Sequence, residues 1–501
     1  MKKKFTAALL AALTLSSAAA CGQTPADTPF EEKAQVNTDA SAAETTTEET
    51  FPADLADDLP RDINLEGRNF VILSRYFDEG SSWQIKDIWT ESENGERIND
   101  SVFQRNLQMY DRFGVTVSLE LKPDVVSEVK KRISAGENSF DAIDDGYMFQ
   151  AGLTIGGFIL DLAALDYLDF SKAWWDRTAI DTLRYAGRLY FAPGCGQLNN
   201  YKGSWCTIFN KRITGDAGVQ DLYQLVRDGG WTLAKLKTFG KMTARDLDGD
   251  GLITWGTDIY GIGTETGAAS PYLHAAGVKF AEFSDDGSYT YSADSEKFVN
   301  AMEIIWNFMN TDNDCLVRID KQKISNQFAE FRKLFKADMA AFYPTSLSTV
   351  TLISGEMESD FGLLPIPKTS ESVDKYYSDV QIGNVYALSI PITDVHPDET
   401  AMLIEGYQML SYDTVRPAYY DITLTVRSIR DTESEEMLEL IFANRNIDLV
   451  MIYNEVTGLN SFILDAMDKK TFTYASDVAS NMDRHKQKID SMIEFFNDIG
   501  N

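Results

Sequence analysis

Short apolar runs alternate with helical patterns along the chain after residue 59. Residues 69–74 (NFVILS) form an apolar run with polar flanks, which predicts a buried strand. Residues 99–113 carry apolar side chains at near-helical spacing and predict a helix that ends at Gly114. Residues 115–121 (VTVSLEL) alternate like a second strand. This alternation predicts an α/β fold built on a mostly parallel sheet.

The second half of the chain is richer in helical patterns. Two helical stretches flank Gly229 and Gly230, and Thr232 is the expected N-cap of the second. Other helices are predicted at 301–309 and 328–335, and the pattern after residue 391 is largely helical. Further short strands are predicted at 141–146, 189–194, 206–213, 339–344, 361–368 and 384–391. The expected fold is α/β throughout, with extra helices at the C-terminal end.

The first twenty residues have the pattern of a secretory signal. Lys2, Lys3 and Lys4 are followed by an apolar run at 5–15 and small residues at 16–20. The apolar run is shorter than the roughly 20 residues that a membrane-spanning helix needs. We therefore expect residues 1–20 to act as a signal peptide and the protein to be exported.

The next segment indicates how the exported protein is held. Cys21 directly follows SSAAA and resembles the lipidated cysteine of a bacterial lipobox, although Ala18 stands where that motif usually has Leu. The alternative is ordinary signal cleavage with an incidental Cys21. Residues 21–59 are rich in Thr, Ala, Glu, Asp and Pro, which predicts a disordered acidic tether. We expect an extracytoplasmic protein, lipid-anchored to the outer face of the bacterial cell membrane.

Charge and cysteine content exclude several classes of protein. The net charge of −31 argues against binding to nucleic acid or to an anionic membrane surface. The other cysteines are Cys195, Cys206 and Cys315, and no Cys-x-x-Cys occurs, so a zinc site is not expected. Cys195 and Cys206 would form a disulfide in one interpretation, and remain unpaired core thiols in the favoured one.

Several stretches, taken in their order along the chain, resemble a known family. They are 165–176 (LDYLDFSKAWWD), 187–194 (GRLYFAPG), 209–251 (from FNKRI to DLDGDG), 363–368 (LLPIPK), 415–421 (VRPAYYD) and 430–445 (RDTESEEMLELIFANR). Together they resemble extracellular solute-binding proteins of the family 1 type, the lipoproteins that deliver sugars to ABC transporters.

The resemblance implies a type II periplasmic-binding-protein fold with two α/β lobes joined by a hinge. One lobe would hold 60–160 and 361–392, the other 161–360, and the helices of 393–501 would pack on both. It also implies a carbohydrate ligand captured between the lobes, permease subunits of an ABC importer as partners, a monomeric protein and no cofactor used in chemistry.

Sugars need flat aromatic surfaces and planar polar side chains, and open α/β sheets bind ligands at the carboxyl ends of their strands. Residues of these types near predicted strand ends are therefore the candidate ligand contacts. They are Arg75, Tyr76, Trp83, Asp145, Tyr147, Asn199, Tyr201, Trp205, Tyr343, Thr345, Asn384 and Tyr386. For each of them, structural packing is the competing role.

The acidic loop DLDGDGLITWGTD matches the first half of a calcium-binding loop. Its expected ligands are the side chains of Asp246, Asp248, Asp250 and Thr254, with the backbone carbonyl of Leu252. Thr257 stands where such a loop has its bidentate Glu, so the site would be structural. The competing interpretation is a solvated acidic turn.

Catalysis is not expected. The sequence has no Gly-x-Ser-x-Gly, no His-Glu-x-x-His and no Walker A loop. A surface glycoside hydrolase stays open as a competing function, because its two carboxylates would meet only in the fold. A sensor or adhesin with the same fold, and a binding protein for peptides or polyols, stay open as well.

Overall fold

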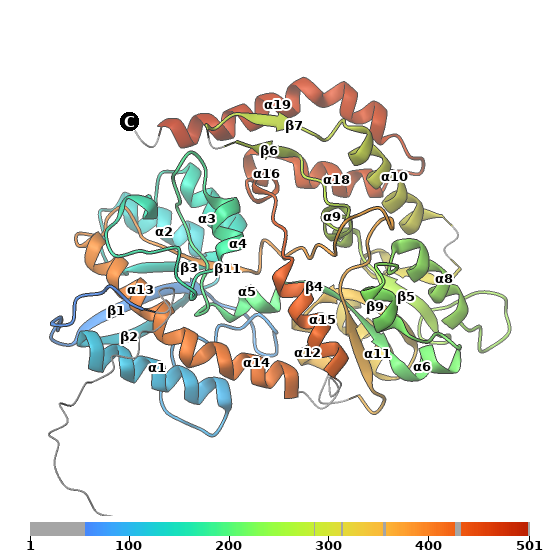
Figure 1. Ribbon diagram of the computed structural model, residues 1–501, viewed down its shortest axis with the longest axis horizontal. Helices are drawn as coiled ribbons and strands as arrows, with labels where there is room; N and C mark the ends of the chain where they lie inside the picture. Colours follow the sequence, from blue (N-terminus) through green and yellow to red (C-terminus); the bar gives the residue numbers. More distant parts are fainter. Residues whose placement is uncertain (1–55, 285, 312–313, 354–356, 426–431, 499–501) are drawn as a thin grey trace, which may run out of the picture. The chain divides into compact units, whose positions relative to one another are not determined.

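The computed structural model describes residues 56–284, 286–311, 314–353, 357–425 and 432–498. They form two main sheets joined by segments that cross between them (Figure 1). The predicted signal peptide, Cys21 and tether residues 22–55 lie outside the described residues. Within these ranges, no helix combines the length and the hydropathy that crossing a membrane would require.

The first sheet has four strands in the order β11-β3-β1-β2. β1 runs parallel to β2 and β3, whereas β11 runs antiparallel to β3. Its strands are β1 (Arg68–Arg75), β2 (Val115–Lys122), β3 (Ala142–Gly146) and β11 (Tyr386–Ser389). Its accompanying helices are α1 (Arg97–Phe113), α2 (Val125–Ser134), α3 (Tyr147–Ile155), η1 (Leu162–Ala164), α4 (Arg177–Leu183), α5 (Leu198–Lys202), α13 (Pro397–Asp413) and α14 (Val415–Thr425).

The second sheet has five strands in the order β10-β4-β9-β5-β8. They are β4 (Trp205–Asn210), β5 (Tyr260–Thr264), β8 (Leu316–Arg318), β9 (Ala340–Ser346) and β10 (Phe361–Leu364). β4 runs antiparallel to both of its neighbours, so this sheet is mixed rather than mostly parallel. Its helices are α6 (Lys211–Asp216), α7 (Leu222–Arg227), α8 (Leu233–Thr243), η3 (Ile319–Lys321), α11 (Gln327–Lys336), α12 (Ser348–Ile353) and α15 (Thr432–Ala443).

A third group of elements contacts the helices of both sheets. It consists of η2 (Thr266–Ala268), α9 (Ala269–His274), the hairpin β6 (Ala281–Phe283) and β7 (Tyr289–Tyr291), α10 (Glu296–Asn310), α16 (Leu449–Ile452), α17 (Asn454–Thr457), α18 (Leu459–Met467) and α19 (Tyr474–Asp498). α16 and α17 contact α3 of the first sheet. α10 contacts α8 of the second sheet, and α18 packs on α9 and α10 within the group (Figure 1).

Local sequence signals account for the ends of several elements. Gly114 ends α1 with φ 67°, and its N–H donates to the carbonyl of Tyr110 at 2.8 Å. Thr232 caps α8 by accepting from the N–H of Lys235 at 3.3 Å. Both predictions are confirmed. The cysteines of the described chain, Cys195, Cys206 and Cys315, are buried and free, which confirms the interpretation as unpaired thiols.

Three crossing segments, 203–205, 378–381 and 444–446, lie side by side between the sheets. The N–H of Trp205 donates to the carbonyl of Asp379 at 2.9 Å, and that of Gln381 donates to Gly203 at 3.0 Å. The N–H of Asn446 donates to the carbonyl of Ser378 at 2.7 Å. We refer to these three segments as the crossing ladder.

Two lobe boundaries expected from the sequence are wrong. Residues 161–202 belong with the first sheet, because Ala192 forms a bridge with Leu388 of β11 and α5 contacts the same strand. β10 belongs to the second sheet, since it pairs with β4 from Phe361 to Leu364. Apolar runs such as 189–194 report that a segment is buried, but not which sheet buries it.

The left-handed turn at Gly114 allows the close packing at the end of α1 to be tested by substitution. A Cβ at this position would lie 2.1 Å from Oδ1 of Asn64, whereas one at Gly157 (φ 65°) would meet nothing within 4 Å. Gly157→Ala therefore introduces only backbone strain, of about 1 kcal/mol. We expect Gly114→Ala to lower the free energy of unfolding by about 2 kcal/mol or more, measured by urea denaturation. Equal losses in the two variants would contradict the steric argument.

Candidate ligand-binding site

Strands of both sheets begin or end near the crossing ladder. In the first sheet, β3 ends at Gly146, which pairs with Tyr386 at the start of β11. In the second sheet, β9 ends at Ser346, which pairs with Trp205 at the start of β4. Because β5 runs parallel to β9, it also ends at this edge. Open α/β sheets place their ligands at such edges.

A cavity of about 310 Å³ lies at this junction. One wall is the crossing ladder, with Trp205 and residues 379–384. A second wall is the segment that follows β5, and it presents Glu265, Ser270 and His274. α16 and α18, with the residue that caps α16, supply the remaining wall through Asp448, Met451, Asn460 and Leu464.

His274 and Asp379 form a buried pair in the cavity wall. Nδ1 of His274 lies 2.9 Å from Oδ1 of Asp379, and both side chains are at most 5% exposed. Burial acts to lower the pKa of His274, but Asp379 and Asp448 outweigh it, so this pKa is raised. Nε2 of His274 has no hydrogen-bond partner among the residues that the structure describes.

Glu265 directly follows β5 and is the second titratable group of the wall. Its carboxylate makes no hydrogen bond or ion pair within the described ranges. Burial, and next the repulsion from Asp320, raise its pKa to about 7. An unpaired acidic group thus lies on the cavity wall.

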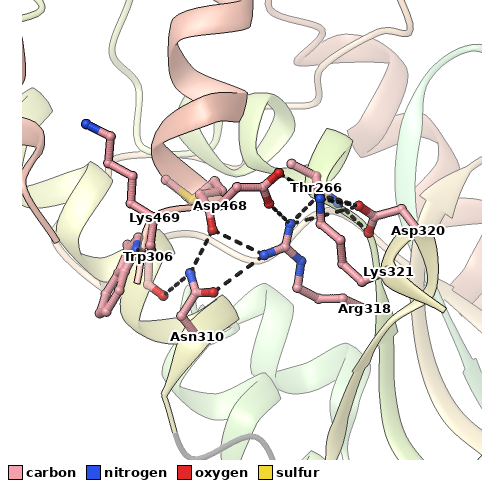
Figure 2. Close-up of polar contacts among 9 residues, drawn as sticks. Thr266, Trp306, Asn310, Arg318, Asp320, Lys321, Asp468 and Lys469 are labelled. Atoms are coloured by element: carbon pink, nitrogen blue, oxygen red, sulfur yellow. Dashed lines mark hydrogen bonds and ion pairs between the residues drawn. The ribbon is translucent and has the colours of Figure 1, made fainter. Parts of the chain in front are cut away.

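A polar network fixes the segment that carries Glu265 (Figure 2). Arg318, at the end of β8, donates to Oδ1 of Asp468 at 2.7 Å, to the carbonyl of Met467 at 3.1 Å and to the hydroxyl of Thr266. The N–H of Thr266 donates to Oδ1 of Asp320 at 3.0 Å. Lys321 binds the other oxygen of Asp468 at 2.7 Å. The end of α18 is therefore tied to η2, so two cavity walls are held together.

Of the sequence-predicted ligand contacts, Trp205 and Asn384 line this cavity. Trp205 is 4% exposed, and its backbone is part of the crossing ladder. Asn384 donates a backbone N–H to Gln381 at 2.7 Å and is half-buried.

A second set of predicted contacts lies at the edge of the first sheet. Arg75 binds both carboxylate oxygens of Asp145, at 2.9 and 2.8 Å, and lies 3.9 Å from the ring centre of Phe149. Burial raises the pKa of Asp145 although Arg75 opposes it. Tyr386 is buried, and its hydroxyl has no partner in the described part of the chain. Tyr76 is 47% exposed.

The predicted contacts around α5 are engaged in packing. The side-chain amide of Asn199 donates to the carbonyl of Trp83 at 3.2 Å, and Trp83 is half-buried. The hydroxyl of Tyr147 donates to Asn200 at 2.8 Å. Tyr201 stacks on Tyr419 with ring centres 5.5 Å apart, and Tyr420 and Phe442 meet it edge-on.

Tyr343 and Thr345 lie in the core of the second sheet. Tyr343 is 2% exposed and packs edge-on against Phe331 at 4.9 Å. Thr345 shares a hydrogen bond of 2.7 Å with Thr349. Neither residue lines the cavity, and their role as ligand contacts stays a prediction.

Three residues of the cavity wall, Glu265, His274 and Asp379, are not predicted from the sequence. Glu265 follows β5, a strand that the pattern did not predict because Gly261 and Gly263 interrupt it. His274 is one of three dispersed histidines, and its partner Asp379 is far away in sequence. The residue types alone carried no signal that these two side chains meet.

The acidic loop brings three carboxylates together outside the cavity. Oxygens of Asp246, Asp248 and Asp250 lie within 4.8 Å of one another, and all three residues are exposed. Asp246 accepts from two backbone N–H groups, of Gly249 and Gly251. Asp258 is buried and accepts from the N–H groups of Leu247 and Thr254 at 2.7 Å. Asp258 therefore holds the loop together through hydrogen bonds to its backbone.

No family model and no curated protein matches this chain. Solved structures do resemble it. The sugar-binding protein MalE from Xanthomonas citri has a TM-score of 0.56 at 12% identity, over 86% of this chain and 99% of the other. The GacH receptor of Streptomyces glaucescens, whose structures include a complex with acarbose, has 0.52 at 14% identity, over 86% and 98%.

A third similar structure is an ABC substrate-binding protein from Listeria monocytogenes in complex with cycloalternan, with a TM-score of 0.51 at 13% identity, over 87% of this chain and 99% of the other. At such identities the likeness shows the fold. The two-lobed α/β fold expected from the sequence is confirmed.

The network of Figure 2 gives a test of the cavity wall. Asp468→Asn removes the charge that pairs with Arg318 and Lys321. Since Asp468 is half-exposed, we expect a loss of about 1 kcal/mol in the free energy of unfolding at low salt, and less at high salt. Exposed Asp111→Asn, which breaks no ion pair of the described chain, serves as the control in urea denaturation. A salt-independent loss would contradict an electrostatic role.

Proposed function

We propose that this protein captures a carbohydrate in the cavity at the crossing ladder and delivers it to the permease of an ABC importer. The observation that carries the proposal is this cavity, where an indole, amides, a hydroxyl and carboxylates converge between two sheets. Its volume of about 310 Å³ lies at the lower end of the range for small-molecule sites.

The chemistry of the wall suits a sugar. Trp205 supplies an aromatic surface for the C–H face of a ring. Asn384, Gln381 and Asn460 supply amide groups, which both donate to and accept from hydroxyls. The similar structures bound to acarbose and cycloalternan support a saccharide ligand for this fold.

The proposed binding and delivery also imply where in the cell the protein is located. We propose export by the signal at 1–20, lipidation at Cys21 and a monomeric body held off the outer face of the membrane by residues 21–59. Peptide or polyol binding, a sensor or adhesin role, and a glycoside hydrolase are the competing functions. Turnover of a bound glycan would identify the last of these.

A ligand screen tests the proposal. A ligand that binds only the native state raises the melting temperature by mass action. We expect a neutral oligosaccharide, in a panel with polyols and short peptides, to raise the melting temperature of the full-length chain. If peptides raised it and no saccharide did, the carbohydrate assignment would be wrong.

Two substitutions test the site itself. Trp205→Ala should weaken saccharide binding by roughly 1–3 kcal/mol, and Asn384→Ala by about 1 kcal/mol, in titration calorimetry. Asn384 is half-buried, so its variant should keep the core if Trp205→Ala does not fold. Trp89, which is 45% exposed and does not line the cavity, provides the control Trp89→Ala. Unchanged affinity in Asn384→Ala would place the ligand elsewhere.

We also propose a structural calcium ion at Asp246, Asp248 and Asp250, with the Leu252 carbonyl and Thr254 as further ligands. The convergence of the three carboxylates supports this, because hard cations prefer oxygen ligands. Calcium should raise the melting temperature of the native chain and leave that of Asp248→Asn unchanged. An equal rise in both would mean that calcium binds elsewhere.

A further inference from the structure

The cavity wall carries an imbalance of charge. Glu265, Asp379 and Asp448 line it, and none of the residues assigned to its wall is a lysine or arginine. A neutral sugar needs hydrogen-bond partners but no net charge. Each of these three carboxylates therefore needs a partner, either in the protein or in the ligand.

Two of the three carboxylates are satisfied by the protein. Asp448 accepts from the backbone N–H groups of Val450 at 2.9 Å and Phe280 at 2.8 Å. Asp379 accepts from the N–H of Val380 at 2.7 Å and has His274 at 2.9 Å. Their charge is already balanced or solvated from within.

Glu265 is different, because its side chain makes no hydrogen bond or ion pair with any residue that the structure describes. The neighbouring strand β8 carries a guanidinium group, because Arg318 pairs in register with Thr264, the residue before Glu265. Arg318 is instead engaged by Asp468, Met467 and Thr266 (Figure 2). The side chain of Arg318 is therefore paired with these groups and not with Glu265.

A second, independent group of the wall is also open to a ligand. His274 is 2% exposed and lines the cavity. Its Nε2 has no partner among the described residues, although a buried polar atom without one is costly. A hydroxyl of a bound molecule would satisfy it. The cavity therefore offers one position for a cation and one for a hydroxyl.

We infer that the ligand is a saccharide that carries a protonated amino group, with its ammonium on the carboxylate of Glu265 and a ring hydroxyl at Nε2 of His274. This inference rests on the proposed carbohydrate binding and narrows its substrate class. A charge-assisted pair in a partly buried site is stronger than a neutral hydrogen bond.

The protonation of Glu265 gives the inference a distinctive readout. Burial raises its pKa to about 7, and Asp320 adds to the shift; Tyr272 and Tyr343 are the other titratable groups coupled to it. Below about pH 7 the carboxyl is protonated in the free protein, and binding an ammonium must first remove the proton. Because the ligand's ammonium must also keep its proton, affinity for the amino saccharide should be highest at a pH between the pKa of Glu265 and that of the ammonium and should fall on either side. Affinity for a neutral saccharide should vary less with pH.

The experiment compares matched ligands on the full-length chain by titration calorimetry. A short chitosan oligosaccharide carries free amines, and its N-acetylated counterpart has the same rings without the charge. At about pH 7 we expect the chitosan oligosaccharide to bind about tenfold more tightly or better. Glu265→Gln should abolish this difference while it keeps the fold, and Glu91→Gln, at an exposed position, should preserve it.

Each outcome decides between the two proposals. Equal affinity for the two oligosaccharides, or an amine preference that survives Glu265→Gln, overturns the inference and leaves carbohydrate binding intact. Failure of both saccharides and of every neutral sugar to bind overturns both. Tight, Glu265-dependent binding of spermidine without saccharide binding would assign the site to polyamines and also overturn the inference.

Discussion

The structure depends on the way in which the three crossing segments pair with one another. Their backbone hydrogen bonds are reinforced by an ion pair of 2.8 Å between Arg445, in the third segment, and Asp176, which caps α4 of the first lobe. Asn200 of α5 donates to the same carboxylate at 3.0 Å. Because Arg445 and Asp176 are only about a tenth exposed, removing one partner would leave a buried charge, at a cost of several kcal/mol. The segments that link the lobes are therefore well-defined structural elements.

Much of the fold could be predicted because local signals and burial agree. In α1, apolar spacing and Gly114 point to the same end, and in α8 the hydroxyl of Thr232 acts as the expected cap. β5 could not be predicted, since Gly261 and Gly263 are poor strand formers. Tertiary packing explains why both positions are glycine. A Cβ at Gly261 would lie 2.1 Å from the carbonyl of Gly240, and one at Gly263 would lie 2.0 Å from the ring of Phe331.

The candidate site could be predicted only in part, for a related reason. Asn384 was predicted beside an apolar run that does form a strand, β11. Trp205 was predicted as a residue after the run 189–194, which is not a strand, and it is instead the first residue of β4. Glu265 follows the unrecognised β5, so the rule of strand ends did not reach it. Tyr201 and Tyr343 have residue types that suit a sugar, but neighbouring rings cover them. Aromatic type and loop position do not distinguish a binding surface from a core, because that depends on what packs opposite.

The cavity wall includes residues 379–381 of the crossing ladder and the three residues that follow them, 382–384. Any rotation of one lobe against the other bends this segment, and so it also changes the shape of the cavity. Occupancy and interlobe angle are therefore thermodynamically linked, and a bound molecule biases the angle by as much as its affinity differs between the two arrangements. Under the proposed function, a permease that senses only this angle would distinguish loaded from empty protein without contacting the ligand.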